Sequence, residues 1–547
     1  MRQEFIISKY KKIFQASVIL VLLCNGQTLV FGQNWQWVKQ FGTPQSETVD
    51  AMQTDQDGNL YLSGKFKDSF AWGTTILQSI GKDDTYLTKL DPLGNPIWAK
   101  RGGSSESDES IALAIDPAGN IYQTGLYWFA SDFGSVSLTA SVGSRAIYLV
   151  KYDEEGNVLW GKSVDGTAGK TVSGCAADAD GNIYLSGSFA GELKIDGTTL
   201  TAGPQGAIFL AKFDATGALL WTQQLAASVS IKSVTLTISP EGEALVAGQF
   251  IGTVDVANDS FTNITGDNDV FLVKYAADGM ALWGRKAGGV YEDDCSQIRT
   301  DAAGNVFLTG TFLGVLELSP DVQIQTDGFN NNFYLLKYNP AGDILWARSL
   351  GGGKADAAED LIINESMLVV SGYFTESMSI DGITVTGNAT IADGFIAAFD
   401  LDGTARKIQT IGSEGFVIPS NLNFTATGEI ISSGVFENTA QFGNEALTAT
   451  GLFDLYFARL GDTFTSVQKA EEFRSQFLLY PNPTAGNVFV QTEEAFMRYE
   501  VYDTAGRWLA EGKAGNAIDL SAFEEGMYFI RLINAEQQQA SFSIQKY

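Results

Sequence analysis

The chain has 547 residues, with 64 Asp and Glu against 35 Lys and Arg, and no histidine. The absence of histidine excludes Ser-His-Asp triads, Cys-His dyads and the common zinc sites. Basic residues form no cluster beyond the N-terminus, which argues against a nucleic-acid partner. The length is sufficient for a large core and a second domain.

Residues 1–33 have the pattern of a secretory signal peptide. Basic residues at positions 2, 9, 11 and 12 precede the apolar run Ile13–Cys24. This run is too short for a permanent membrane helix, so we expect cleavage near Phe31–Gln33 and no transmembrane segment in the mature chain. Cys24 falls in this leader, whereas Cys175 and Cys295 are expected to be buried small hydrophobes.

One phrase recurs seven times and is clearest in Thr54–Phe66, TDQDGNLYLSGKF. It returns at Ile115–Tyr127, Ala177–Phe189 and Thr300–Phe312, with weaker copies elsewhere. The glycine of each copy falls at positions 64, 125, 187, 248, 310, 372 and 434, so the period is 61 or 62 residues. A fixed period of this size predicts stacked or radial supersecondary units.

Each repeat contains four strand-like segments. In the second repeat they are Ser110–Asp116, Asn120–Tyr127, Ala146–Asp153 and Asn157–Ser163, and an extra short strand is expected at Phe133–Thr139. Many strand residues are apolar on both faces, which predicts four-stranded sheets stacked face to face around an axis. The repeated lysines are expected along the sheet edges, with their stems on apolar surface; they are Lys89, Lys151, Lys212, Lys274 and Lys337.

The strand count predicts that the repeats close into a ring. A strand with an aromatic residue occurs seven times, at Tyr86, Tyr148, Phe209, Phe271, Tyr334, Phe395 and Tyr456. A fourth strand follows only six of them, carrying Trp98, Trp160, Trp221, Trp283, Trp346 and, in the sixth place, Lys407. One unpartnered strand, with Trp37, starts the mature chain. Pairing it with the Tyr456 strand predicts an all-β, seven-bladed β-propeller over residues 34–460, closed by the N-terminal strand.

The repeats resemble the SBBP family of bacterial β-propeller repeats. The resemblance lies in the D-x-x-G-N-x-Y-x-x-G-x-F phrase and the following D-x-x-G-N-x-x-W hairpin, and it extends over the whole repeat region. The family implies the propeller fold and no single activity.

The repeat ends near residue 460, and a polar linker (461–475) leads to a compact β unit, residues 476–547. This unit resembles the type A C-terminal sorting domain of the type IX secretion system of Bacteroidota. The resemblance lies in LYPNPTAG (Leu479–Gly486), YEVYDTAGR (Tyr499–Arg507), IDLSAFEEGMYFIRL (Ile518–Leu532) and Lys546. The motif residues are Pro481, Asn482, Pro483, Gly486, Asp503, Gly506, Gly526, Tyr528 and Lys546.

The sorting resemblance implies a small C-terminal β-sandwich that uses the type IX machinery as its partner. It implies export across the outer membrane to the cell surface or the medium. In the family the tail is usually removed, and the cargo is released or joined to a surface lipopolysaccharide.

Two motifs invite a cofactor. The turns Asp55–Asn59 and Asp178–Asn182 place carboxylates as in a calcium loop, but Phe66 and Phe189 stand where an EF-hand needs glutamate. Asp also starts turns by accepting backbone N–H groups, which is our preferred interpretation. Hairpins such as Phe213–Trp221 also look like the tryptophan-docking repeats of quinoprotein dehydrogenases, although packing between blades explains the tryptophan. We therefore expect no cofactor, with Ca²⁺ as the alternative.

Acidic residues recur where one repeat leads into the next. They are Glu47, Asp108, Glu109, Asp293, Asp294 and Asp360. In a closed ring these loops share one face, so the sequence predicts an acidic rim at the channel mouth, either merely solvated or binding cationic ligands. The preferred function is a non-catalytic binding or adhesion module for an extracellular glycan or protein. The alternatives are a polysaccharide hydrolase or lyase that uses these carboxylates, and a passive surface spacer.

Overall fold

The computed structural model describes residues 35–42, 47–461 and 477–547, apart from positions 142, 168, 264, 327, 329, 353, 493–495, 497, 504–506, 514, 516 and 534–538. The signal peptide, nearly all of the linker and Gly506 therefore lie outside the described residues. The chain divides into two compact units, residues 1–460 and 461–547. The described residues of both are built from β-strands.

The first unit contains seven four-stranded antiparallel units among its described residues, numbered here blade 1 to blade 7 because they are consistent with propeller blades. Their first strands are β2 (Ala51–Thr54), β6 (Glu109–Ile115), β12 (Thr171–Ala177), β16 (Ser230–Ile238), β22 (Asp294–Thr300), β28 (Ala357–Ile363) and β34 (Val417–Phe424). Their second strands are β3 (Leu60–Trp72), β7 (Ile121–Trp128), β13 (Ile183–Ile195), β17 (Ala244–Ile251), β23 (Val306–Phe312), β29 (Leu368–Phe374) and β35 (Ile430–Phe436).

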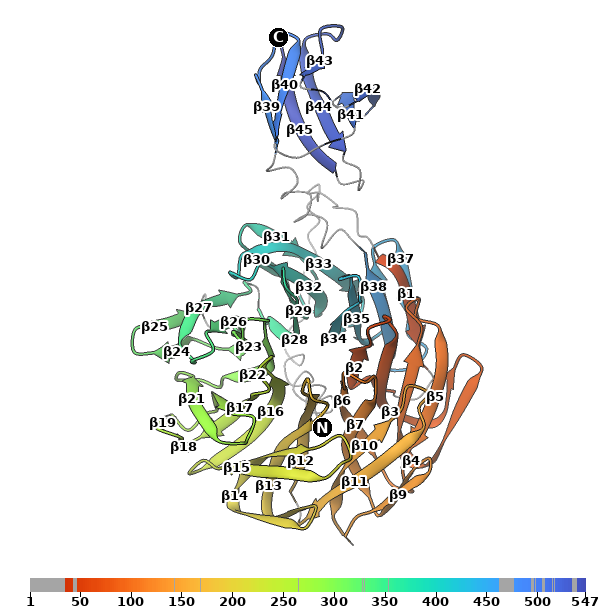
Figure 1. Cartoon of the computed structure of the whole chain (residues 1–547), viewed down its shortest axis with the longest axis vertical. Helices are drawn as coiled ribbons and strands as arrows, with labels where there is room; N and C mark the ends of the chain where they lie inside the picture. Colours follow the sequence, from red (N-terminus) through yellow and green to blue (C-terminus); the bar gives the residue numbers. More distant parts are fainter. Residues whose placement is uncertain are drawn as a thin grey trace. The chain divides into compact units, whose positions relative to one another are not determined.

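The third strands are β4 (Thr75–Leu90), β10 (Arg145–Tyr152), β14 (Thr198–Phe213), β20 (Asp269–Tyr275), β26 (Asn332–Tyr338), β32 (Asp393–Phe399) and β38 (Asp454–Leu460). The fourth strands are β5 (Pro96–Gly102), β11 (Val158–Gly166), β15 (Leu219–Leu225), β21 (Ala281–Ala287), β27 (Ile344–Leu350), β33 (Ala405–Ser413) and β1 (Trp35–Phe41). The first strands surround a common centre, each contacts the next, and β34 contacts β2 (Figure 1).

Strand β1 completes blade 7, because it pairs with β38 rather than with its neighbours in sequence. In this antiparallel ladder Gln40 lies opposite Tyr456, and Trp37 lies opposite Arg459. The Phe41 ring then packs against Trp72 of blade 1, with ring centroids 4.5 Å apart. The N-terminal strand thus covers an edge of the last blade and also contacts the first.

The connector between the second and third strands is an outer β-hairpin, so the extra strand expected at Phe133–Thr139 is one half of a regular element. The separate hairpins are β8–β9 (Ala130–Phe133, Val136–Thr139), β18–β19 (Thr253–Val256, Asp259–Thr262), β24–β25 (Val315–Ser319, Val322–Gln325), β30–β31 (Ser377–Ile380, Ile383–Thr386) and β36–β37 (Thr439–Phe442, Glu445–Thr448). In blades 1 and 3 the outer hairpin is formed by the extended ends of the second and third strands, β3 with β4 and β13 with β14. Each hairpin of blades 2–7 pairs with the end of the preceding blade's fourth strand.

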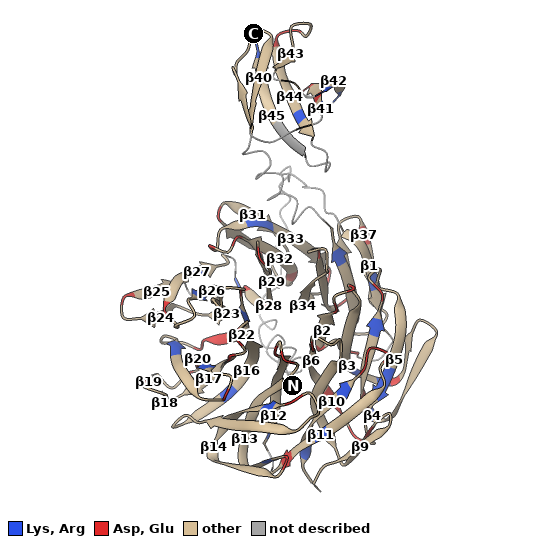
Figure 2. Cartoon of the chain, viewed as in Figure 1, with Lys and Arg blue, Asp and Glu red and all other residues tan. Residues whose placement is uncertain are grey.

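The repeated Asp-x-x-Gly-Asn turn is a structural element that also holds a buried lysine. In blade 3, Asp178 Oδ1 accepts the N–H groups of Asp180 and Asn182, and Lys212 Nζ lies 3.0 Å from Asp178 Oδ2. The same acid–base pair recurs in other blades, as Lys89–Asp55, Lys151–Asp116 and Lys337–Asp301. In blades 4 and 7 the acid is instead a glutamate at the fifth position of the turn, in the pairs Lys274–Glu243 and Arg459–Glu429. Lys89, Lys151, Lys212 and Lys274 are buried and Lys337 is half-buried. They lie in the third strands, which are inner strands of their sheets, and this corrects the expectation that they lie along sheet edges. Basic residues recur from blade to blade (Figure 2).

In most blades a tryptophan, this cation, or both contact the next blade. Trp160 Nε1 and Lys151 Nζ of blade 2 both donate to the Ala215 carbonyl, in the turn between β14 and β15 of blade 3, at 3.2 and 3.1 Å. The indole lies over Gly217 of that turn, which has a positive φ of 86° and no side chain to obstruct the ring. Between blades 7 and 1, Trp37 lies over Gly94 and Arg459 donates to the Pro92 carbonyl at 3.0 Å.

Blade 6 lacks both of these donors, and blade 7 lacks the turn that would receive them. The third strand of blade 6 has Ala398 where the other blades have lysine or arginine, and its fourth strand has Lys407 where they have tryptophan. In blade 7 the third strand β38 ends at Leu460, and its fourth strand β1 begins at Trp35, so no turn connects them. The lysine and tryptophan are thus missing from the sixth repeat because the next blade has no turn to accept their hydrogen bonds.

The C-terminal unit is a sandwich of two sheets around its own core. One sheet has the order β39 (Phe477–Tyr480), β40 (Asn487–Thr492), β43 (Ala517–Asp519), and the other has the order β42 (Trp508–Lys513), β41 (Arg498–Asp503), β44 (Gly526–Ile533), β45 (Gln539–Lys546). The buried residues include Val488, Val501, Ile518, Ile530 and Leu532.

The sorting motif holds this sandwich together. Asn482, between Pro481 and Pro483, donates to the Ser543 carbonyl and accepts the Gln545 N–H, each at 2.9 Å. Lys546 is buried and donates to the carbonyls of Ser521 and Phe523, and it pairs with Gly526 in the last ladder. Three further motif residues are also engaged: the Gly486 carbonyl accepts Leu520 N–H, Asp503 accepts Arg507 N–H, and Tyr528 donates to the Glu524 carbonyl.

Candidate functional site

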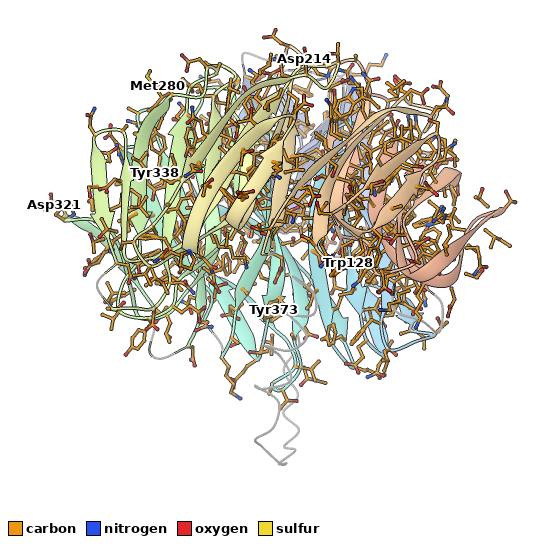
Figure 3. All side chains as sticks on the ribbon, turned by 90° about the horizontal axis from the view of Figure 1, so that it is seen from below. Trp128, Asp214, Met280, Asp321, Tyr338 and Tyr373 are labelled. Carbon is orange, nitrogen blue, oxygen red and sulfur yellow. The ribbon has the colours of Figure 1, made fainter. Side chains whose placement is uncertain are left out.

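Antiparallel strands give the first unit two distinct faces. The connections from the second to the third strand, and from each fourth strand to the next blade, emerge on one face, named here the loop face. The tight turns emerge on the opposite face, named the turn face. Figure 3 places Trp128 and Tyr373, which lie at or next to the ends of second strands, away from Asp214 and Met280, which belong to turns. The turns repeat from blade to blade, whereas the connections on the loop face differ in sequence.

Three loops between blades are closed by an aspartate on the loop face. Asp108, Asp293 and Asp356 each accept the backbone N–H of the residue four positions earlier, at 2.5, 2.8 and 2.7 Å. The loops closed in this way begin at Ser104, Gly289 and Gly352. The third aspartate was missed by sequence reasoning, although each loop is preceded by a glycine (Gly103, Gly288 and Gly351) five residues before its aspartate, which was a usable signal.

The predicted acidic residues do not form a rim of free carboxylates. Glu47, Asp108, Asp293 and Asp360 are buried, and only Glu109 and Asp294 are partly exposed. Glu109 is paired with Arg145, with 3.0 Å between Oε2 and Nη2, and Asp294 accepts a hydrogen bond from Gln249. The solvated rim expected from the sequence is therefore wrong for the four buried residues. Asp108 and Asp293 lie beneath the loops that they close.

Asp360 belongs to a different structural position from Asp108 and Asp293. It lies within first strand β28, where its Oδ2 accepts the Leu422 N–H of blade 7 at 2.8 Å. Its Oδ1 accepts Gln297 Nε2 of blade 5 at 3.0 Å. Asp360 therefore joins three successive first strands around the centre, and it positions the wall instead of offering a free ligand group.

Burial raises the pKa of two of these aspartates. The pKa of Asp108 rises to about 6 because of burial, opposed by hydrogen bonds from Ser104, Trp128 and Ser131. The pKa of Asp293 rises to about 8 because of burial, with the nearby Asp269 and Asp294 carboxylates adding to the effect. In contrast, the pKa of Glu109 is lowered: burial acts to raise it, but Arg145 outweighs burial.

We expect the Asp293→Asn variant to be more stable than the wild type at pH 8. The folded chain holds the Asp293 proton up to about pH 8, whereas the unfolded chain releases it near pH 3.8. Asp293 therefore favours folding at acid pH, and this contribution to stability is lost as the pH rises from the unfolded pKa of 3.8 to the folded pKa of about 8. An amide keeps the acceptor for Gly289 N–H and never ionises. Thermal melting at pH 8 should show a higher Tm for the variant, and the difference should shrink towards pH 4.

Asp108→Asn is the matched control, because it changes the same loop position in another blade. Both Asp108 oxygens already accept hydrogen bonds, from Ser104 N–H, Trp128 N–H and Ser131 Oγ. The amide nitrogen would face a donor, so this variant should melt at a lower temperature at pH 8. An Asp293→Asn variant that gains no stability at pH 8 would contradict the assignment.

Aromatic side chains on the loop face were not singled out by sequence reasoning. Tyr291 lies in the loop closed by Asp293, packs over Gly314 and leaves 38% of its surface exposed. Phe129 is 43% exposed and follows Trp128, whose N–H is held by Asp108 at 3.1 Å. Phe416 and Phe453 contact one another, with ring centroids 5.2 Å apart and the ring planes tilted by 37°. The buried acids thus position the backbone that presents aromatic rings.

The described residues contain no group of three or more His, Cys, Asp or Glu arranged to hold a metal ion. In the two turns considered for calcium, the carboxylate oxygens of Asp55 and Asp178 are already engaged by turn N–H groups, by the Asn side chain and by a lysine. This arrangement agrees with the turn interpretation of Asp55 and Asp178.

The C-terminal unit has a direct counterpart among known families. Residues 478–545 match the family model described as the secretion system C-terminal sorting domain. The tail is a type IX sorting domain. It directs the protein to the cell surface or the medium and implies an interaction with the type IX secretion machinery. None of the described residues forms a helix of the length and apolarity needed to cross a membrane.

The remaining comparisons concern the repeats and are distant. The uncharacterized WD repeat-containing protein L264 of Acanthamoeba polyphaga mimivirus is 21% identical over 504 residues, covering 73% of this chain and 36% of that protein. The regulatory protein FlaEY of Caulobacter vibrioides is 24% identical over 317 residues, covering 53% of this chain and 32% of that protein. The chain thus spans about a third of the length of these relatives.

Solved structures that match this chain superpose on it poorly overall. The extracellular domain of the putative hybrid two component system BT4673 from B. thetaiotaomicron is 11% identical, with a TM-score of 0.20 and coverage of 94% of this chain and 99% of that one. A mutant of puromycin hydrolase complexed with PGG is 11% identical, with a TM-score of 0.30 and coverage of 72% of this chain and 58% of that one.

Proposed function

We propose that residues 34–460 form a closed, seven-bladed propeller of the SBBP type, preceded by a signal peptide (1–33) and followed by a linker (461–475) and the sorting domain (476–547). The β1–β38 ladder supports closure, as does the contact between β34 and β2. Trp37 over Gly94 and Arg459 on Pro92 also repeat, between blades 7 and 1, the contacts that join the other blades.

We propose that this propeller is a non-catalytic binding module for an extracellular ligand, a glycan or a protein, which it contacts through the loop face. The observation that carries the proposal is the set of aromatic rings held there, chiefly Tyr291 and Phe129. An aromatic ring fixed on one side and exposed on the other offers a rigid apolar surface beside a polar group, as recurs in binding sites. The regular turn face has no comparable variation between blades.

The mature chain is expected to bind a ligand on a glycan array or among immobilised surface proteins, and binding should depend on Tyr291. Tyr291→Ala combined with Phe129→Ala should weaken binding about tenfold or more, because aromatic anchors carry a large share of interface energy. Met280→Ala is the matched control, because Met280 is 61% exposed on the turn face. Equal loss of binding in the control, or unchanged binding in the double variant, would contradict the proposal.

A further inference from the structure

The motif residues of the sorting domain make contacts within the domain itself. Asn482, Tyr528 and Lys546 are engaged in holding the two sheets and the terminal strand together. Tyr528 and Lys546 are also buried. Buried side chains are not accessible to another protein, and the amide of Asn482, although exposed, is already engaged by the terminal strand. A partner that recognises the folded tail must therefore contact one of its outer faces.

The outer face of the larger sheet carries a row of aromatic side chains. Tyr502 of β41 lies between Trp508 of β42 and Phe529 of β44 in the registered ladders, so the three side chains share one face. Met527 lies two residues from Phe529 and shares this face. Trp508 is 56%, Met527 46% and Phe529 40% exposed. These four residues, with Arg531, are named here the aromatic face.

Arginine completes this face. The Arg531 guanidinium lies 4.8 Å from the centre of the Tyr502 ring and pairs with Glu500 at 3.6 Å. Arg507, the residue before Trp508, has 79% of its side chain exposed. Trp, Tyr and Arg are the residue types most enriched at the centres of protein interfaces, where they fill pockets on the partner. A partner surface complementary to this face would be an apolar cleft with carboxylates at its border.

We propose that the aromatic face is the surface by which a protein of the secretion machinery holds the sorting domain during export. The inference rests on the export role of the tail, and it adds which surface of the tail the machinery binds. The identity of the domain supplies the occupant, because a sorting domain must be contacted by the machinery that exports it. The other outer face, with Leu478, Tyr480 and Phe489, is also apolar but has no tryptophan or arginine among its described residues.

The test compares the two outer faces in the full-length chain, produced in the bacterium that encodes it. Trp508→Ala with Phe529→Ala removes two exposed rings from the aromatic face, and Tyr480→Ala with Phe489→Ala removes two from the other face. The fraction of protein outside the cell is measured by immunoblotting. We expect the first pair to reduce export about tenfold or more and the second to leave it nearly unchanged.

Folding is checked by limited proteolysis of each purified full-length variant. If the first pair is protease-sensitive, Met527→Lys serves in its place, because it adds a charge at an exposed position and removes no packing. Normal export of a folded aromatic-face variant, or a loss confined to the other face, would overturn the proposal.

Deleting residues 477–547 distinguishes a failure of this proposal from a failure of the export role. Export of the truncated chain would overturn the export role of the tail. Ligand binding by the loop face is measured separately.

Discussion

A chain that begins after residue 42 is expected to lose the cooperative folding of the repeat unit. Strand β1 supplies the ladder along β38, buries Val38 and packs Phe41 against Trp72. Each apolar side chain that is removed costs about 1.5–3 kcal/mol. With Trp35 and Trp37 included, the summed loss is similar to the whole stability of a domain, about 5–15 kcal/mol. Circular dichroism should show a broad transition at a markedly lower temperature.

A disulfide tests the same pairing without removing residues. Val38 and Ala458 are opposite one another in the β1–β38 ladder, although 420 positions separate them in the chain. In a background with Cys175→Ala and Cys295→Ala, the Val38→Cys, Ala458→Cys variant should form a cross-link under oxidation, visible as a shift in gel mobility. Val38→Cys with Ala211→Cys of blade 3 is the control and should remain reduced. No cross-link in the first variant would mean that the repeats form an open row.

Much of the first unit could be predicted from the sequence because the information is local and repeated. The turn phrase, the alternation of the strands and the unpartnered Trp37 strand are all visible along the chain. The outer hairpins were anticipated only at Phe133–Thr139, because their sequences vary while their backbone pairing is constant. The missing tryptophan at Lys407 was visible as an irregularity, but its reason lies in the missing turn of the neighbouring blade.

The candidate site could be predicted only in its position along the chain. The loops before the first strands were identified, but a sequence does not show whether an aspartate points outwards or closes its own loop. Asp108 and Asp293 accept N–H groups four residues earlier, whereas Asp360 joins three strands from different blades. The Asp360 contacts join residues about one repeat period apart, so no local sequence pattern predicts them. Tyr291 was missed because its exposure depends on packing over Gly314, a residue of the outer hairpin.

Replacing Asp178 by alanine is expected to destabilise the repeat unit by about 3–5 kcal/mol, because it leaves the buried Lys212 without its charge partner. Asp178 Oδ2 lies 3.0 Å from Lys212 Nζ, and Oδ1 accepts two N–H groups of the turn. Its pKa is lowered: burial acts to raise it, but the hydrogen bonds of Asn182 and Lys212 outweigh burial. The stability contributed by this aspartate is therefore present above the unfolded pKa of about 4 and is lost as the pH falls below it.

The double variant Asp178→Asn, Lys212→Ala should recover much of the loss, because it removes both charges and keeps the turn acceptor. Blade 6 contains this combination naturally, with Asn364 at the aspartate position and Ala398 at the lysine position, and its Asn364 Oδ1 still accepts the N–H of Ser366. Thermal melting of the wild type, Asp178→Asn, Lys212→Ala and the double variant forms a cycle that isolates the pair. Strictly additive losses would show that the aspartate and lysine act independently, and that the ion pair does not join the turn to the third strand.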